Sequence, residues 1–470
     1  MTDLKFLYQI YLEHPEVTTD SRRCPGGSLF FALKGESFDG NRFADKALEA
    51  GASIAVVDDE TVIPEGDLLT AEHADGHYLL VPDVLSTLQG LAAYHRQQFS
   101  GPVLQVTGTN GKTTTKELIA AVLSRKYNVL YTQGNLNNHI GVPLTLLRLR
   151  TDEHQVAIIE TGANHPDEIR QLTDIVRPDY GLITNVGRAH LEGFGSFEGV
   201  KRTKGELYDY LLSHEGCHVF VSEASADLIG MLSERGATLD DARCISYARI
   251  ESSAKSCRCV GAVASADPFV NVWWRRNDQE QASTQDVATH LIGAYNLDNV
   301  LAAICVGLEF GVPEDDISAA LTEYEPTLGR SEYRKTERNE LIIDAYNANL
   351  TSMLAALQNL QQIEHPRKMV ILGDMKELGE ESRNAHCQVV RTILGAGVNT
   401  IWLVGPEFRS AVQDLQATDN EVAIALGTKI TLFDDVEAVK QAIAANQPEL
   451  HLILVKGSNS TRLHQLPPLL

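Results

Sequence analysis

The chain has 470 residues, of which 43% are apolar and 22% charged, a composition typical of a soluble globular protein. At about 150 residues per domain, this length predicts three domains. The formal net charge of −23 would repel a nucleic-acid backbone, so nucleic acid is excluded as a partner and anionic substrates must be met by local cations or metal ions.

Targeting and membrane segments are not expected. Residues 1–13 carry charges among their apolar residues, which predicts an amphipathic helix instead of the apolar core of a signal peptide. The sequence has no apolar run of about 18 residues that could span a membrane. The seven cysteines are scattered and odd in number, which is typical of free thiols in a reducing compartment. We therefore expect a cytoplasmic protein.

Residues 1–98 are predicted to form a small α/β domain, in which short strands alternate with helical stretches. The strands are expected at 28–33, 54–57 and 78–81, and the helices at 43–50 and 84–99. Polar motifs lie between them: Thr-Asp-Ser-Arg at 19–22, Gly-Gly-Ser-Leu-Phe-Phe-Ala-Leu at 26–33 and Phe-Asp-Gly-Asn-Arg-Phe at 38–43. Taken singly, these motifs are equally well explained as ordinary turns at strand ends.

Residues 99–322 are predicted to form a central domain with a doubly wound parallel sheet, since strands recur at βαβ spacing. The strands are expected at 103–107, 129–132, 156–159, 181–184 and 219–222. In such sheets ligands bind beyond the carboxyl ends of the strands. Residues 235–290 add predicted antiparallel strands, to which we assign no function.

A phosphate-binding loop is predicted at the start of this domain. The motif Gly-Thr-Asn-Gly-Lys-Thr at 108–113 follows an apolar strand and precedes a helical pattern. Gly108 and Gly111 allow backbone N–H groups to approach phosphates, Lys112 supplies a cation and the Thr113 hydroxyl can bind Mg²⁺. The general loop has four residues between its glycines and this one has two, so an ordinary turn before a helix remains the alternative.

Further candidates follow the ends of the next strands. Glu160 ends an apolar strand, which is the expected place for a metal ligand facing the loop. His190 lies in a glycine-rich loop, although a single histidine there could also be a surface residue. Lys204 follows Lys201 and Arg202 on a helix, where charge patterning alone indicates a solvated basic face. Asn137 and Asn138 lie in a turn-rich loop, where the alternative role of asparagine is to supply left-handed backbone.

Residues 323–470 are predicted to form a second Rossmann-like domain without a phosphate-binding glycine triplet. Its strands are expected at 341–344, 369–372, 401–404 and 451–455, alternating with helices such as 352–363. The chain is therefore predicted to be an α/β protein with three domains, of which the central one is a doubly wound ATPase-like domain.

The motifs together resemble the Mur ligase superfamily, which also contains the folylpolyglutamate synthases. The shortened loop at 108–113 is similar to the ATP loop of that superfamily, and the first domain is similar to its uridine-binding domain. The other motifs that match are Thr-Asn-Val-Gly-Arg-Ala-His-Leu-Glu-Gly-Phe-Gly-Ser at 184–196, Lys-Gly-Glu at 204–206, Gly-Arg at 329–330, Asp-Ala-Tyr-Asn-Ala-Asn at 344–349, Gly-Asp-Met-Lys-Glu-Leu-Gly at 373–379 and Lys-Gly-Ser at 456–458.

The resemblance implies a role for each candidate residue. ATP would be bound by Gly108, Thr109, Asn110, Gly111, Lys112, Thr113 and Thr114, with Asn296 at adenine, Arg330 at the γ-phosphate and Asp344 at the ribose. The UDP-linked substrate would be bound by Ser21, Arg22, Asp39, Gly40, Asn137 and Asn138, and the incoming dipeptide by Asn347 and Asn349. Two Mg²⁺ ions would be held by Thr113, Glu160, His190 and a carbamylated Lys204, and catalysis would depend on Lys112, Glu160, His190, Lys204 and Arg330.

The resemblance also implies an activity, namely ATP-dependent addition of D-alanyl-D-alanine to UDP-N-acetylmuramoyl-tripeptide through an acyl phosphate, carried out by a monomer. The motif at 373–379 favours this reaction, and the Asp-Asn-Pro-Arg motif of third-residue ligases is absent from the sequence. Third-residue addition, a folylpolyglutamate synthase, and a P-loop switch that makes no bond are the alternatives. The chain departs from the family pattern at Glu223, Tyr295 and Leu350.

Overall fold

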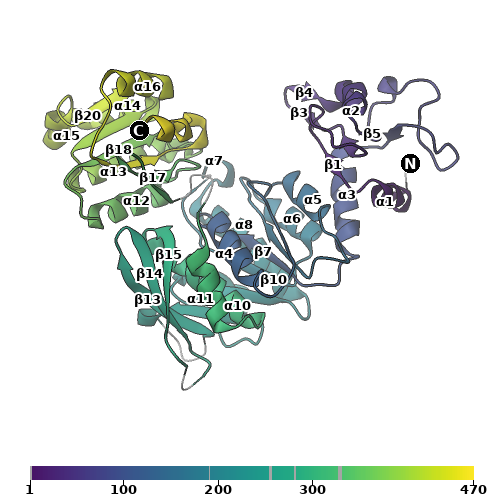
Figure 1. The fold of residues 1–470 in the computed structure, drawn as a ribbon, viewed down its shortest axis with the longest axis horizontal. Coiled ribbons are helices and arrows are strands. Elements are labelled where there is room, and N and C mark those ends of the chain that lie inside the picture. Colours follow the sequence, from purple (N-terminus) through teal and green to yellow (C-terminus); the bar gives the residue numbers. More distant parts are fainter. Residues whose placement is uncertain (1–2, 190, 253–256, 280–281, 327–330) are drawn as a thin grey trace.

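The computed structural model describes residues 3–189, 191–252, 257–279, 282–326 and 331–470. Three bodies are visible in Figure 1, with the N-terminal and C-terminal domains on opposite sides of the central domain. This arrangement confirms the predicted α/β fold with three domains. No helix in these described ranges is long and apolar enough to cross a membrane.

The N-terminal domain is built on a small parallel sheet of order β1-β2-β5-β6. All four residues of its strand β5 are buried, as the apolar sequence of that strand dictates. The strands are β1 (Val17–Thr18), β2 (Leu29–Phe31), β5 (Ile54–Val57) and β6 (Tyr78–Leu80), with a separate hairpin β3 (Lys34–Gly35) and β4 (Phe38–Asp39). The helices are α1 (Leu4–Glu13), α2 (Ala44–Glu49) and α3 (Val84–Arg96).

Helices α1 and α3 join this domain to the central one. One apolar cluster continues from Leu7 of α1 through Leu91 of α3 to Leu146 and Val176 of the central domain. At the end of α3, the Arg96 guanidinium donates hydrogen bonds to the carbonyl oxygens of Val176 and Arg177 at 3.0 and 2.9 Å. The two domains therefore share a core.

The central sheet has nine strands in the order β15-β14-β13-β12-β11-β10-β7-β9-β8. Its strands are β7 (Val103–Thr107), β8 (Val129–Tyr131), β9 (Val156–Glu160), β10 (Tyr180–Ile183), β11 (His218–Ser222), β12 (Cys244–Arg249), β13 (Cys259–Ala266), β14 (Phe269–Arg276) and β15 (Gln285–Ile292). Its helices are α4 (Lys112–Leu123), α5 (Gly141–Leu146), α6 (Glu168–Val176), α7 (Leu191–Phe194), α8 (Phe197–Ser213), α9 (Ala226–Ser233), α10 (Leu297–Glu309) and α11 (Glu314–Glu323).

Helices cover both faces of this sheet, as expected for a doubly wound fold. Strand β7 is buried throughout because its two faces pack against different helices. Leu104 and Val106 lie in the cluster with α4 and α10, whereas Val103 lies in the cluster with α3 and α6. Neighbouring strands are parallel from β8 to β13, and the pairs β13–β14 and β14–β15 are antiparallel.

The C-terminal domain has a sheet of order β16-β17-β21-β18-β19-β20, in which only the β16–β17 pair is antiparallel among the described strands. Its strands are β16 (Glu332–Lys335), β17 (Glu340–Asp344), β18 (Lys368–Gly373), β19 (Thr400–Val404), β20 (Ile430–Phe433) and β21 (Leu452–Lys456). Its helices are α12 (Leu350–Gln362), α13 (Ser382–Gly395), α14 (Pro406–Gln416), α15 (Asn420–Ala425) and α16 (Val436–Ala445).

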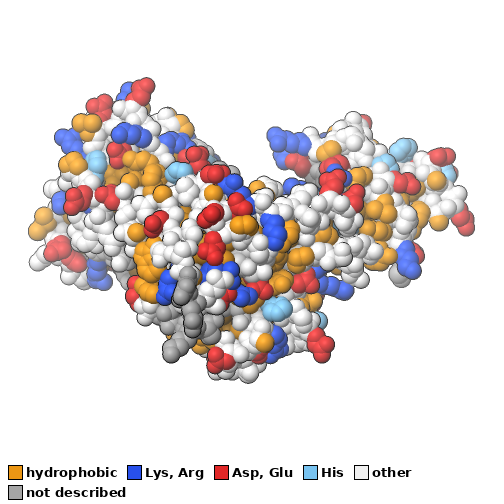
Figure 2. All heavy atoms as spheres, turned by 60° about the horizontal axis from the view of Figure 1, so that its bottom comes forward, with side chains coloured by type: hydrophobic (Ala, Val, Ile, Leu, Met, Phe, Trp, Pro, Cys, Tyr) orange, Lys and Arg blue, Asp and Glu red, His pale blue; other side chains and the backbone are white. Residues whose placement is uncertain are grey.

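The surface carries charges of both signs. On the face drawn in Figure 2, acidic side chains are interspersed with Lys and Arg, and the surface is hollowed between the two outer domains. The acidic side chains of the described residues do not gather into one patch on this face. Because the whole chain has a net charge of −23, a binding site for anions needs its own cations.

Candidate active site

A cavity of about 840 Å³ lies where the three domains meet. Its walls include Gln89 of α3, the loop at 108–112, and Asn347 and Lys456 of the C-terminal domain. Strands β7, β9 and β10 point their carboxyl ends toward it, as expected for a ligand site in a doubly wound sheet. The volume is within the usual range of small-molecule sites, about 300–1,000 Å³.

Both glycines of the predicted phosphate loop have backbone conformations that other residues rarely adopt. Gly108 has φ +140°, and a Cβ there would lie 2.1 Å from the Thr184 hydroxyl oxygen. Gly111 has φ +77°, and a Cβ there would lie 2.7 Å from the Asn299 side-chain oxygen. Helix α4 begins immediately afterwards, at Lys112, so its N-terminal end faces the cavity. The loop has the backbone features of a phosphate cradle, and phosphate binding there stays a prediction.

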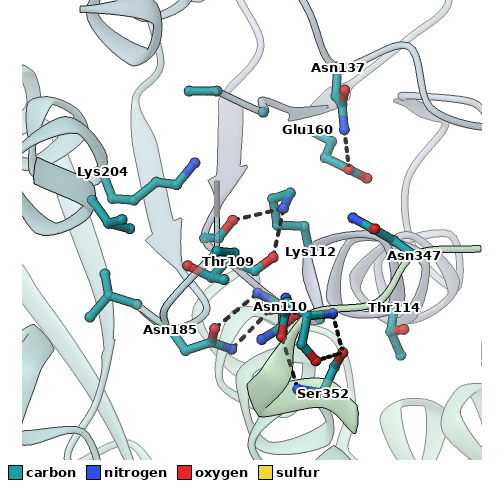
Figure 3. A pocket seen from close by; sticks show the side chains of 18 of the residues that line it. Thr109, Asn110, Lys112, Thr114, Asn137, Glu160, Asn185, Lys204, Asn347 and Ser352 are labelled. Atoms are coloured by element: carbon teal, nitrogen blue, oxygen red, sulfur yellow. Dashed lines mark hydrogen bonds between the residues drawn. The ribbon is translucent and has the colours of Figure 1, made fainter. Parts of the chain in front are cut away.

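The Lys112 ammonium folds back over its own loop. It donates hydrogen bonds to the carbonyl oxygens of Gly108 and Thr109 at 2.7 and 3.0 Å (Figure 3). Since Lys112 also lines the cavity, a rotation of its side chain would bring the charge to a bound phosphate. Thr109, Asn110 and Thr114 line the same cavity.

Glu160 lies beside the start of α4 and is only 1% exposed. Its Oε1 accepts hydrogen bonds from the Thr113 hydroxyl at 3.1 Å and from the Asn137 amide at 2.8 Å (Figure 3 shows the second). Its Oε2 is buried and has no hydrogen-bond partner in the described part of the chain. A buried carboxylate oxygen without a partner is costly unless a cation binds it.

These oxygens fit Mg²⁺, which prefers carboxylate and hydroxyl ligands and takes few of them from the protein. Thr113 and Glu160 are the described residues that could hold it. The described ranges contain no group of three or more His, Cys, Asp or Glu side chains placed to hold a metal. His190, another of the predicted ligands, lies outside the described residues, as does Arg330.

Lys204 projects from α8 into the same cavity (Figure 3). It is 3% exposed, and its Nζ lies 5.7 Å from the centre of the Phe194 ring. Burial, with the charge of Lys112 as a second cause, lowers the pKa of Lys204 to about 7. The solvated-face alternative is wrong for Lys204. Lys201 of the same helix is partly buried and pairs with Asp227 at 2.8 Å.

The residues predicted at adenine and ribose also line the cavity. The Asn296 amide donates to the Ile292 carbonyl oxygen at 2.8 Å, which fixes its orientation. The Asp344 carboxylate at the end of β17 accepts a hydrogen bond from Lys456 at 2.5 Å. Sequence reasoning assigned no role to Lys456, although it ends an apolar strand in the same way as Glu160.

Asn347 and Asn349 line the cavity in the loop before α12, and Asn138 lines it before α5. The Asn349 amide contacts Asn110 of the phosphate loop at 2.8 Å. The Asn138 side-chain oxygen accepts a hydrogen bond from the Gly141 N–H at 2.8 Å, so it also orders its own loop.

The residues predicted to bind the UDP-linked substrate are divided between two places. Asn137 and Asn138 of the central domain line this cavity, whereas the four predicted residues of the N-terminal domain do not: Ser21, Arg22, Asp39 and Gly40. Arg22 is 86% exposed in its side chain and pairs with Asp20 at 2.8 Å, and Ser21 is next to it. The Asp39 carboxylate accepts a hydrogen bond from the Asn41 N–H at 3.0 Å. A Cβ at Gly40 would lie 2.3 Å from the Leu33 carbonyl oxygen, so glycine is required there. Their contact with a substrate stays a prediction.

Comparison with known families accounts for nearly all of the chain. Residues 15–96 match the model of the Mur ligase family catalytic domain, residues 106–307 the Mur ligase middle domain and residues 329–459 the Mur ligase glutamate ligase domain. The UDP-N-acetylmuramoyl-tripeptide–D-alanyl-D-alanine ligase of Escherichia coli is 35% identical over 460 residues, which cover 96% of this chain and 92% of that protein. The chain belongs to the Mur ligase family.

Similar Mur ligases include the protein of the same name from Bacillus subtilis, 32% identical over 96% of this chain and 92% of its own length. Among solved structures, MurF from Acinetobacter baumannii has a TM-score of 0.78 at 31% identity, covering 96% of this Mur ligase and 92% of its own chain. MurF ligase from Thermotoga maritima in complex with ADP has a TM-score of 0.76 at 25% identity, with coverages of 100% and 98%. These relatives confirm the resemblance found in the sequence.

Proposed function

We propose that this Mur ligase joins D-alanyl-D-alanine to UDP-N-acetylmuramoyl-tripeptide, converting ATP to ADP and phosphate, in the synthesis of peptidoglycan precursors. The observation that carries the proposal is the single cavity in which the phosphate loop, Glu160 and Lys204 meet residues of the outer domains. A cavity with walls from several domains can bind a nucleotide and two further substrates at the same time. The relatives named UDP-N-acetylmuramoyl-tripeptide–D-alanyl-D-alanine ligase, which match 96% of this chain and 92% of their own length, support the choice of substrates.

In the first step, an oxygen of the tripeptide's terminal carboxylate attacks the γ-phosphorus of ATP, the bond to the ADP oxygen breaks, and an acyl phosphate forms. Lys112, turned from its own loop carbonyls, and the predicted Arg330 stabilise the negative charge on the transferred group. The α4 N-terminus and the loop N–H groups hold the remaining phosphates. Mg²⁺, when bound beside Thr113 and Glu160, neutralises phosphate charge.

In the second step, the dipeptide amine attacks the acyl carbon, loses a proton and expels phosphate, which leaves the new amide. Asn347 of the C-terminal domain is the proposed contact for the dipeptide, because it lines the cavity opposite the phosphate loop. Walls from three domains exclude water, which would otherwise hydrolyse the acyl phosphate.

The proposal includes a carbamate on Lys204 and two Mg²⁺ ions. The neutral amine of Lys204 would attack carbon dioxide, form an N–C bond and release a proton, giving an anion in place of a cation. Lys204 is buried, and its amine has no hydrogen-bond partner among the described residues. Both features favour the neutral amine that this reaction needs. The carbamate would then supply a second anion to the cavity that the Glu160 carboxylate also lines.

Two alternatives explain fewer of the observations. A folylpolyglutamate synthase needs no uridine-binding domain, and the solved synthase of Mycobacterium tuberculosis covers 82% of this chain at 14% identity, which indicates the fold alone. A P-loop switch that forms no bond would leave the C-terminal wall of the cavity, including Asp344 and Lys456, without a role. We further propose a cytoplasmic monomer, and the free cysteines of the chain fit a reducing compartment.

The test is mass analysis of the product formed from UDP-N-acetylmuramoyl-tripeptide, ATP, Mg²⁺ and D-alanyl-D-alanine. We expect one ADP and one phosphate for each pentapeptide product, and no product from a single D-alanine or from L-alanyl-L-alanine. Release of ADP without a new amide would support the switch, and a product with a folate and glutamate would support the synthase. Light scattering of the purified chain would test the monomer.

A further inference from the structure

The side chain of Asn349 makes two separate contacts. Its Oδ1 accepts a hydrogen bond from the Ser352 N–H at 2.9 Å, and its own N–H donates to the Ser352 hydroxyl at 3.1 Å, which together cap the start of α12. Its Nδ2 donates a hydrogen bond to Asn110 Oδ1 at 2.8 Å. Asn349 therefore connects the first turn of a C-terminal helix to the phosphate loop.

Among the described residues, the backbone of Asn110 forms its hydrogen bonds with the central domain. Its N–H donates to Asn185 Oδ1 at 3.0 Å, and its carbonyl oxygen accepts a hydrogen bond from the Asn185 amide at 2.9 Å (Figure 3). The same carbonyl oxygen accepts a hydrogen bond from the Thr184 hydroxyl at 2.7 Å. Only the side chain of Asn110 is oriented by the C-terminal domain, through Asn349.

This contact determines which end of the Asn110 amide is free to bind a ligand. Because Oδ1 accepts from Asn349, the Nδ2 group is the end left over, and it has no hydrogen-bond partner in the described part of the chain. Asn110 lines the cavity between Gly108 and Lys112. An amide N–H₂ in that place is a donor for a phosphate oxygen.

We propose that Asn349 is a positioning residue for the nucleotide: it orients the Asn110 amide toward the phosphates and holds the C-terminal domain against the phosphate loop. This inference rests on the proposed function, in that a nucleotide must bind at 108–113. It differs from the predicted role of Asn349 as a dipeptide contact, because both ends of its amide are occupied by the protein.

The contact also predicts coupling between the two domains. A nucleotide phosphate that binds Asn110 Nδ2 stabilises the amide orientation that Asn349 requires, so nucleotide binding favours the docked C-terminal domain. By linkage, docking of that domain strengthens nucleotide binding by the same factor. One neutral hydrogen bond corresponds to about a three- to tenfold change in affinity.

Variants of Asn349 can separate the cap from the contact with Asn110. Asn349→Ser keeps a good cap residue for α12 but is too short to reach Asn110, and Asn349→Asp keeps the cap but places an acceptor opposite Asn110 Oδ1. Ser352→Ala is the matched control, because it weakens the cap and leaves the amide contact in place. A double variant, Asn110→Ala with Asn349→Ser, tests whether the two side chains act as one unit.

The experiment measures binding of ADP with Mg²⁺ to the full chain by calorimetry, without other substrates, and then KM for ATP and for the dipeptide. We expect Asn349→Ser and Asn349→Asp to weaken ADP binding about three- to tenfold. We expect the dipeptide KM to change less, and the double variant to bind ADP as Asn110→Ala does. Ser352→Ala should lower the melting temperature while ADP affinity is kept.

Unchanged ADP affinity in Asn349→Ser with a raised dipeptide KM would overturn the inference and restore the dipeptide contact. Additive losses in the double variant would also overturn it. The readout is independent of the acceptor, so a different ligase product would overturn the proposed function and leave this inference standing. Failure of the unaltered chain to bind ADP would overturn both.

Discussion

Replacing Lys204 with methionine should make the ligand-free protein more stable and inactive. Methionine keeps the length of the side chain and removes its charge. Lys204 is 3% exposed on α8, and its amine lies over the Phe194 ring. The pKa of Lys204 falls from 10.5 to about 7. At about 1.4 kcal/mol per pKa unit, the protonated amine costs the folded state on the order of 5 kcal/mol.

The sign of the pH dependence follows from where the proton is bound. The unfolded chain keeps this proton up to pH 10.5, whereas the folded chain releases it near pH 7. The cost is therefore complete below pH 7 and declines as the pH rises toward 10.5. Asn349→Ser, which leaves α8 unchanged, is a control for effects of mutation on the cavity.

The assay is denaturant unfolding of both proteins in buffer free of carbon dioxide at pH 6, 7.5 and 9, with ligase activity measured in parallel. We expect Lys204→Met to gain roughly 2–5 kcal/mol at pH 6 and less at pH 9. A methionine variant that is less stable at every pH, or that keeps full activity, would refute the reasoning. Lys204→Ala with added acetate should regain part of the activity if an anion is needed there.

The remaining predictions concern other parts of the site and the domain junction. Lys112→Ala should abolish tripeptide-dependent ADP release, because the loop loses its cation, and near-normal turnover would remove Lys112 from the mechanism. Glu160→Gln should raise the Mg²⁺ concentration needed for half-maximal activity at least tenfold, and an unchanged metal titration would contradict the site. Arg22→Ala should raise the KM of the UDP-linked substrate with little change for the dipeptide; equal changes would contradict the division between domains. Burial lowers the pKa of His95, so the unfolded chain binds a proton there more readily than the folded chain does. Stability should therefore fall as the pH drops below about 6.5, and His95→Gln should lose less stability over this range in thermal melts.

Features set by a few neighbouring residues could be predicted from the sequence. The apolar runs of β5 and β7 are buried on both faces, and their bounds agree with the predicted ranges 54–57 and 103–107. The phosphate loop was predicted because glycine, lysine and hydroxyl residues must follow one another for its chemistry. Strand β20 is not among the predicted strands, since Ile430–Phe433 is short and has an exposed position that interrupts its apolar pattern.

Features that depend on how the domains meet could not be predicted. The contact between Asn110 and Asn349 joins residues 239 positions apart, and no local pattern specifies such a pair. The burial of Lys204 could not be predicted either, because its sequence neighbours Lys201 and Arg202 indicate an exposed helix face. Lys456 could have been predicted as a site residue from its local sequence, because it is the charged last residue of an apolar strand, as Glu160 is. That pattern was applied to Glu160 alone.

The apolar cluster shared by α1, α3 and the central domain has a consequence for substrate recognition. A long ligand that touches both the N-terminal and the central domain meets surfaces whose relative orientation is already fixed by this cluster and by the hydrogen bonds of Arg96. Its association therefore loses no freedom of one domain relative to the other, so more of the contact energy remains as affinity. The distance between the N-terminal and central surfaces is then fixed, so it selects ligands by their length as well as by their end groups.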